Sequence, residues 1–172
     1  MTLAHRLRTQ QRMRRAEGYL ELGMPQHALD ALDDITDAGT SSGRVDLLRG
    51  YALRALGRHV EAIYPLINAA ETNPSDIHIW LALGWCYKRI QRIDLAIESL
   101  EHALEAAPDE ALVHYNLSCY WSLAGNKART LEYLARALEL DPDYRDLIPN
   151  ESDFDPFRND SDFQSLVTSL EV

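Results

Sequence analysis

The stretch that decides the fold is WLALGWCY at residues 80–87, followed by Ala96, Leu100, Ala103 and Pro108. The same residue types return at a fixed step along the chain, and a step of about 34 residues is typical of stacked helical repeats. The columns that keep this register are Gly23/Gly57/Gln91/Gly125, Ala28/Ala62/Ala96/Thr130, Leu32/Leu66/Leu100/Leu134, Ile35/Ala69/Ala103/Ala137, Tyr19/Leu53/Tyr87/Trp121, Ala16/Gly50/Gly84/Ser118 and Thr40/Pro74/Pro108/Pro142.

Each column has a physical role in a pair of helices. Small residues such as Gly84 allow a neighbouring helix to approach closely, and the glycine column tolerates the positive φ that ends a helix. The prolines end the second helix of each of the later three units. Each unit is therefore predicted to be a helix of roughly 14 residues, a tight turn and a second helix of similar length. The candidate N-caps beside the prolines are Ser75 or Asp76, Asp109 and Asp143.

These residues resemble the signature of the tetratricopeptide repeat (TPR) family. The resemblance covers about residues 9–142 and is most complete in the third unit. It implies an all-α fold, a right-handed α-solenoid of stacked antiparallel helix pairs over residues 1–142, with units at about 9–42, 43–76, 77–110 and 111–144. The first two units depart from the family pattern, because charged residues stand where apolar ones are usual: Arg12, Arg15, Asp46 and Arg49.

The repeat stops after Pro142, and residues 143–172 are expected to form a C-terminal cap. A last helix is predicted from about Asp162 to Leu170, with Ser161 and Gln164 at the spacing of a capping box. All three phenylalanines lie in this tail and offer apolar cover for the open end of the array. The alternative is a detachable segment that folds back into the groove as a self-inhibitor. Earlier in the chain, residues 37–43 are predicted to be a long polar loop.

Composition and charge exclude several classes of protein. The net charge of −10 disfavours nucleic-acid binding, although residues 1–15 carry five arginines and no acid. No apolar run is long enough to span a membrane, and the N-terminus lacks the apolar stretch of a secretory signal. Only two cysteines are present, Cys86 and Cys119, so a disulfide framework is not expected and a reducing cytoplasm fits best.

No motif for catalysis, a metal or a cofactor is recognisable. Six histidines are scattered without the spacing of a metal site, and His78 and His114 are interpreted as surface residues. The two cysteines are expected to be buried thiols. The chain is therefore predicted to be neither an enzyme nor a metalloprotein, and to use no cofactor.

The family resemblance implies that one stripe of each first helix lines a concave groove. Leucine and aromatic residues provide apolar anchors in this stripe, and arginine and lysine provide charge, with no acid among them. The predicted partner-binding residues are Arg44, Leu47, Tyr51, Arg54, His78, Leu81, Trp85, Lys88, Arg89, Leu112, Tyr115 and Cys119.

This stripe predicts a groove for a protein or peptide that carries acidic beside apolar residues, since Trp, Tyr and Arg often dominate interface energy. A competing interpretation is that Leu47, Leu81 and Leu112 simply pack against the second helices. The sequence leaves three functions open: an adaptor or scaffold, a secretion-type chaperone for an unfolded client, and a regulatory subunit of an enzyme complex.

Overall fold

A computed structural model of the chain describes residues 2–33, 35 and 42–168. The described residues form helices, short 3-10 segments and turns, and they contain no strand. They divide into two compact units, Met1–Gln91 and Arg92–Val172. Most of the predicted loop at 37–43 lies outside the described residues, as do Thr40 and Leu170.

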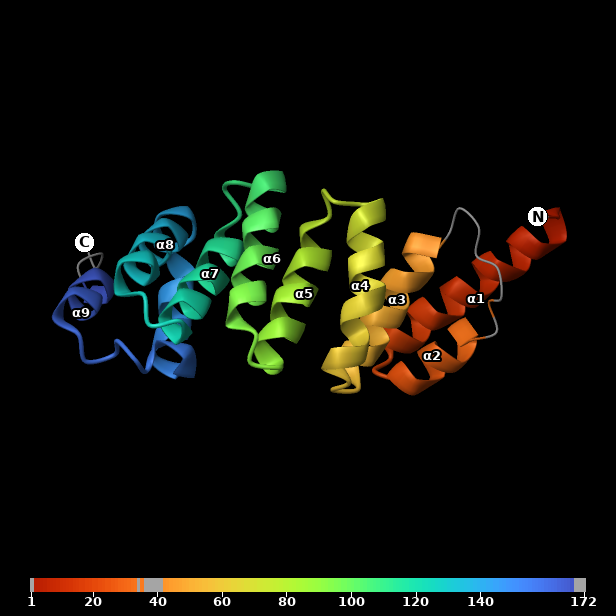
Figure 1. Ribbon diagram of the computed structural model, residues 1–172, viewed down its shortest axis with the longest axis horizontal. Coiled ribbons are helices and arrows are strands. Elements are labelled where there is room, and N and C mark those ends of the chain that lie inside the picture. Colours follow the sequence, from red (N-terminus) through yellow and green to blue (C-terminus); the bar gives the residue numbers. More distant parts are fainter. Residues whose placement is uncertain (1, 34, 36–41, 169–172) are drawn as a thin grey trace. The chain divides into compact units, whose positions relative to one another are not determined.

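The described residues of the first unit form the helices α1 (Leu3–Glu21), α2 (Pro25–Asp33), α3 (Ser42–Ala55), α4 (His59–Thr72) and α5 (Ile77–Arg89) (Figure 1). The helix α1 packs against α2, α3 packs against α4, and α5 adds to the unit by packing on α4. The helices α3, α4 and α5 have 14, 14 and 13 residues, in agreement with the predicted length. The first helix is longer, with 19 residues.

The second unit contains α6 (Ile93–Ala106), α7 (Ala111–Leu123) and α8 (Lys127–Leu140), followed by two 3-10 segments, η2 (Pro142–Asn150) and η3 (Ser152–Phe154), and by α9 (Ser161–Thr168) (Figure 1). The helix α7 packs against both α6 and α8. Among the described helices, none is both long enough and apolar enough to cross a membrane.

The turns between the helices confirm the glycine column. Gly23, Gly57 and Gly125 have φ values of 68°, 74° and 74°. Gln91 occupies the same column and also has a positive φ, of 65°, although it carries a side chain. The left-handed conformation costs a non-glycine residue roughly 1–2 kcal/mol of conformational free energy. The repeat therefore imposes the left-handed turn even where no glycine is present.

The core follows the other columns. The four leucines of the repeated leucine column are fully buried, as are the four residues of the Ala28 column. The small column is needed for close approach: a Cβ on Gly50 would lie 2.5 Å from Cγ of Leu66, which belongs to α4. These contacts explain why the repeat period is visible in the sequence.

The helix caps agree with the predictions only in part. Asp76 caps α5 by accepting a hydrogen bond from the backbone N–H of His78, at 3.0 Å. Asp109 does not cap α7. The N-cap there is Glu110, and Asp109 instead pairs with Arg136 of α8, at 2.6 Å. The prediction for Asp109 was wrong because a carboxylate at a helix start can also reach a cation on the neighbouring helix.

The predicted N-cap at Asp143 was also wrong. Asp141 occupies the N-cap of η2 and accepts a hydrogen bond from the N–H of Asp143, at 3.0 Å. At α9 the predicted capping box of Ser161 and Gln164 does not form. Asp160 accepts hydrogen bonds from the N–H groups of two residues in the first turn, and Gln164 donates to the carbonyl of Arg158. An aspartate one residue earlier thus takes the place of the serine.

The C-terminal segment is held by an aromatic cluster. Phe154 is fully buried, and the centre of its ring lies 5.8 Å from that of Tyr115 and 5.3 Å from that of Phe163. Tyr144 contributes a fourth ring, 4.8 Å from Tyr115. The segment therefore packs on α7 through η3 and on α8 through η2 and α9.

Candidate functional site

The predicted stripe of α3 belongs to a helix that contacts both α1 and α5. Arg44 is exposed and pairs with Glu17 of α1, at 2.8 Å. Leu47 is buried, so it packs in the core of the unit whether or not it also contacts a partner. Tyr51 is half-buried, and the guanidinium of Arg54 lies 5.4 Å from the centre of its ring. The stripe therefore places one aromatic ring beneath a cation.

The predicted stripe of α5 repeats this arrangement around a larger ring. Trp85 is 38% exposed. Its ring has Arg89 at 5.5 Å and Lys88 at 5.9 Å, both in cation–π contact, while the ring of His59 meets it edge-on at 6.4 Å. Tryptophan is the best aromatic partner for such cations. Earlier on the same helix, His78 is exposed and Leu81 is half-buried.

We refer to these two stripes together as the α3–α5 face. The two helices contact one another within the first unit. The members of the face recur at spacings of three and four residues along each helix, which places them on one side of it. The α3–α5 face consists of Arg44, Leu47, Tyr51, Arg54, His78, Leu81, Trp85, Lys88 and Arg89.

The positive charge of the face comes from arginine and Lys88 rather than from His59. Burial lowers the pKa of His59, and the charges of Arg89 and Arg54 lower it further. The imidazole is therefore neutral near pH 7. Burial raises the pKa of Tyr51, and the carboxylate of Asp76 raises it further, against the opposing effect of Arg54 and Arg44. The phenol of Tyr51 thus stays protonated and available as a hydrogen-bond donor.

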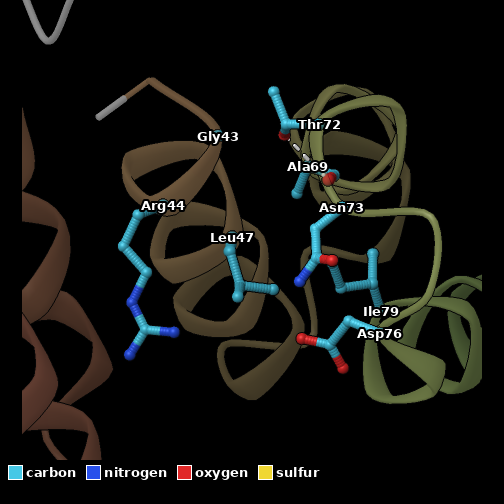
Figure 2. Close-up of a pocket in the computed structure, with 8 residues that line it drawn as sticks. All are labelled: Gly43, Arg44, Leu47, Ala69, Thr72, Asn73, Asp76 and Ile79. Carbon is cyan, nitrogen blue, oxygen red and sulfur yellow. Dashed lines mark hydrogen bonds between the residues drawn. The ribbon is translucent and has the colours of Figure 1, made fainter. Parts of the chain in front are cut away.

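A pocket of about 200 Å³ opens at the start of α3, between this helix, the end of α4 and the start of α5. Figure 2 shows the carboxylate of Asp76 and the amide of Asn73 pointing toward the side chain of Leu47. Because Gly43 has no side chain, Thr72 fits beside it at the rim of the pocket. The hydroxyl of Thr72 donates to carbonyls of α4. The residues that line the pocket are Gly43, Arg44, Leu47, Ala69, Thr72, Asn73, Asp76 and Ile79.

Two acids near this face were missed from the sequence. Glu17 comes from α1 and neutralises Arg44, and Asp76 precedes the first residue of α5 and lines the pocket. The expectation of a stripe without acids considered only residues within the helix stripes. Asp76 was predicted as a possible N-cap. Its second role, lining the pocket, depends on the three-dimensional arrangement of the helices and has no signal in the sequence pattern.

The stripe of α7 is in a different environment from the stripe of α5. Tyr115 is 5% exposed and Cys119 is 2% exposed, and Leu112 is half-buried. The rings of Tyr144 and Phe154 lie against Tyr115. The expectation of an open stripe on the fourth unit is therefore corrected, because the C-terminal segment of the chain covers it.

The remaining candidate residues are structural. Cys86 and Cys119 are both buried thiols, as predicted, and burial raises the pKa of Cys86 to about 11. His114 was expected at the surface, but it is buried, and its Nε2 lies 2.7 Å from the carbonyl oxygen of Pro108. Trp80, one repeat earlier, makes the same contact with Pro74 at 2.8 Å. His114 thus takes the position that the aromatic residue Trp80 occupies in the preceding repeat.

Comparison with known proteins agrees with this architecture. Two family models, both described as tetratricopeptide repeat, match residues 3–77 and 53–117. A curated relative, the phagocyte signaling-impaired protein of Drosophila pseudoobscura pseudoobscura, is 29% identical over 111 residues. The match covers 63% of this chain but only 12% of that much longer protein.

Solved structures with the same fold include MamA and YrrB. The MamA crystal structure has a TM-score of 0.74 at 20% identity, covering 80% of this chain and 81% of that chain. YrrB, described as a TPR protein with an unusual peptide-binding site, has a TM-score of 0.71 at 24% identity, covering 78% of this chain and 70% of that chain.

The two family matches overlap and together run through residues 3–117, the same part of the chain in which the repeat period, the left-handed turns and the buried leucine column recur. The all-α helical-repeat fold predicted from the sequence is confirmed, and the chain belongs to the tetratricopeptide repeat family.

Proposed function

We propose that the protein is a non-catalytic interaction module that holds a segment of a partner protein on the α3–α5 face. Repeat proteins of this kind use their extended surfaces for binding. The observation that carries the proposal is the exposed ring of Trp85 with two cations stacked on it. A tryptophan that keeps more than a third of its surface in water still has apolar area that a ligand can bury.

The partner that fits carries an acidic residue beside an apolar one. The apolar side chain would cover Trp85 and Tyr51, and the carboxylate would meet Arg89 and Arg54. Near pH 7, His59 is uncharged, so the attraction depends on the arginines and Lys88 rather than on His59. Guanidinium groups bind carboxylates with paired hydrogen bonds, which favours arginine over a diffuse positive charge.

The other end of the face has the opposite preference. Arg44 is already paired with Glu17, and Asp76 offers a carboxylate beside the pocket at Leu47. This end suits a hydrogen-bond donor or a basic side chain of the partner. The two ends therefore impose a direction on a bound segment, with its acid near Trp85 and its donor near Asp76.

The test is a library of immobilised peptides that vary in the order of acidic, apolar and basic residues, followed by calorimetry on the best binder. The double variant Trp85→Ala with Arg89→Glu is expected to bind at least about 30-fold more weakly, since one buried anchor contributes about 2 kcal/mol or more. Binding should also weaken as salt is raised.

A matched control is Tyr64→Ala with Arg8→Glu. It removes one exposed aromatic ring and reverses one arginine on helices outside the face, so the net charge changes equally. This control should bind like the parent chain. Equal affinity of the parent and the Trp85 variant, with both folded by circular dichroism, would dispose of the proposal. An adaptor, a chaperone and a regulatory subunit would all use such a face, so the three functions stay open. The cytoplasmic location also stays a prediction.

A further inference from the structure

Three groups that commonly bind metals meet where the C-terminal segment contacts α7. Cys119 lies on α7, and Glu151 and Asp153 lie at the start of η3. The sulfur of Cys119 and one carboxylate oxygen from each acid lie within 4.8 Å of one another. Cys119 is 2% exposed, Asp153 is 6% exposed and Glu151 is half-buried. The cluster is therefore largely shielded from water.

A fourth group lies close to the same place. The hydroxyl of Tyr115 belongs to a residue that is only 5% exposed, and it has no hydrogen-bond partner among the described residues. Tyr115 lies one turn before Cys119 on α7, so both side chains leave the same side of the helix. The hydroxyl of Tyr115 is therefore a buried polar group without a described partner, on the same face of α7 as Cys119.

The position of the two acids is fixed by the chain around them. Glu151 accepts a hydrogen bond from the backbone N–H of Asp153, at 3.1 Å. Arg158 donates to the carbonyls of Ile148, Pro149 and Glu151, which holds the turn before η3 in one conformation. These contacts reduce the conformational entropy that an ion would otherwise have to overcome on binding.

We propose that Cys119, Glu151 and Asp153 form a binding site for one divalent transition-metal ion of the zinc class, with the hydroxyl of Tyr115 beside it. A thiolate ligand favours zinc or a similar ion over magnesium or calcium, which take oxygen ligands. Bond lengths of about 2.3 Å to sulfur and about 2.0–2.2 Å to oxygen place one sulfur and two oxygens about 3.3–3.7 Å apart in a tetrahedral site. No two of the three ligand atoms are more than 4.8 Å apart, so side-chain shifts of about an ångström would bring them to that separation.

Binding replaces one proton with the ion. The thiol of Cys119 releases its proton to solvent as the sulfur bonds to the metal, so affinity should rise with pH. Water or the phenol oxygen completes the coordination. Because the ligands come from α7 and η3, the ion would connect the C-terminal segment to the last repeat. This role is separate from the proposed binding face, which lies on the first unit.

The test begins with full-length protein freed of metal by a chelator. Cobalt(II) is then added in steps, because a thiolate bound to cobalt gives a charge-transfer absorption that carboxylates and histidines do not give. Zinc should displace the cobalt with a stoichiometry of one. Excess zinc should raise the melting temperature by about 5 °C or more, as expected for a chain of this size when the ion is at about 100 times its Kd.

The two cysteines provide the control. Cys119→Ser and Asp153→Asn should abolish the cobalt absorption and the zinc-dependent rise, whereas Cys86→Ser, which changes the other buried thiol, should keep both. A cobalt–thiolate absorption that survives in Cys119→Ser, or its absence from the parent chain, would overturn the proposal. Circular dichroism of each metal-free variant identifies any that fail to fold. If only one of Cys119→Ser and Asp153→Asn folds, that variant alone is sufficient to test the proposal.

Discussion

Trp85 in α5 and Cys119 in α7 occupy equivalent positions in successive repeats, yet Trp85 is 38% exposed and Cys119 is 2% exposed. The two helices are alike in length and in the columns that bury them. The difference arises outside the repeat. At α7 the chain's own C-terminal segment supplies Tyr144 and Phe154, which cover the stripe. Equivalent repeat positions can thus serve either binding or closure.

The largest effect is expected from removing the cover on α7. Phe154→Ala deletes a fully buried ring that contacts Tyr115 and Phe163, and it should lower the free energy of unfolding of the second unit by about 3–5 kcal/mol. Urea denaturation followed by circular dichroism would measure this loss. Phe157→Ala, which changes a half-buried ring of the same segment, should cost clearly less. Equal losses would mean that Phe154 has no special role in closure.

A smaller effect of opposite sign is expected at the covered stripe itself. Tyr115→Phe keeps the ring contacts but removes a buried hydroxyl without a hydrogen-bond partner among the described residues, so it should stabilise the metal-free protein by about 1 kcal/mol. Thermal unfolding in the presence of a chelator provides the measurement. A loss of stability would show that the hydroxyl is already satisfied in solution.

On the open stripe, the corresponding change should affect stability less than binding. Trp85→Ala is expected to cost about 1–2 kcal/mol of unfolding free energy, less than Phe154→Ala, since more than a third of the ring is in water and it contacts the side chains of Arg89 and Lys88. Chemical denaturation alongside Phe154→Ala gives a direct comparison. If both variants lost equal stability, the distinction between an open and a closed stripe would fail.

The smallest effect concerns pH and the attachment of α9. Lys127 pairs with Asp160 at 2.7 Å and with Asp162 at 2.6 Å. The hydrogen bond from Lys127 lowers the pKa of Asp160, so this contribution is present above the ordinary carboxyl pKa of about 4 and is lost as pH falls through the lowered value. Lys127→Met should therefore show a weaker loss of thermal stability between pH 6 and pH 3. An unchanged pH profile would contradict the role of the pair.

Much of the fold could be predicted from the sequence because repeated packing leaves a repeated signal. Leu66 and Leu100 are buried for the same reason, and Gly57 and Gln91 form the same turn. The helix starts were harder. Asp109 and Asp160 differ in role although both are aspartates near a helix start, because one reaches Arg136 and the other caps α9. Those choices depend on neighbours that are distant in sequence.

The candidate site was predictable where it lies within one helix and unpredictable where it joins separate segments. The residues of the stripe around Trp85 follow helical spacing along one helix, and the family resemblance implies that this stripe faces the groove. The contribution of Glu17 to the α3 stripe and the meeting of Cys119 with Asp153 had no spacing signal, since the members of each pair belong to different elements. A C-terminal cap was expected from the phenylalanines of the tail, but the α7 stripe that it covers could not be identified, because the segment does not repeat and has no second copy to compare.

The contacts from Trp80 to the carbonyl of Pro74 and from His114 to the carbonyl of Pro108 have a consequence for proteolysis. A carbonyl only accepts, so Nε2 of His114 carries the proton and donates, as the indole does. Each exposed linker before a helix is thereby tied to the helix after it. A protease must pull a chain into extended form before it can cut, and these two linkers should resist digestion even though water reaches them.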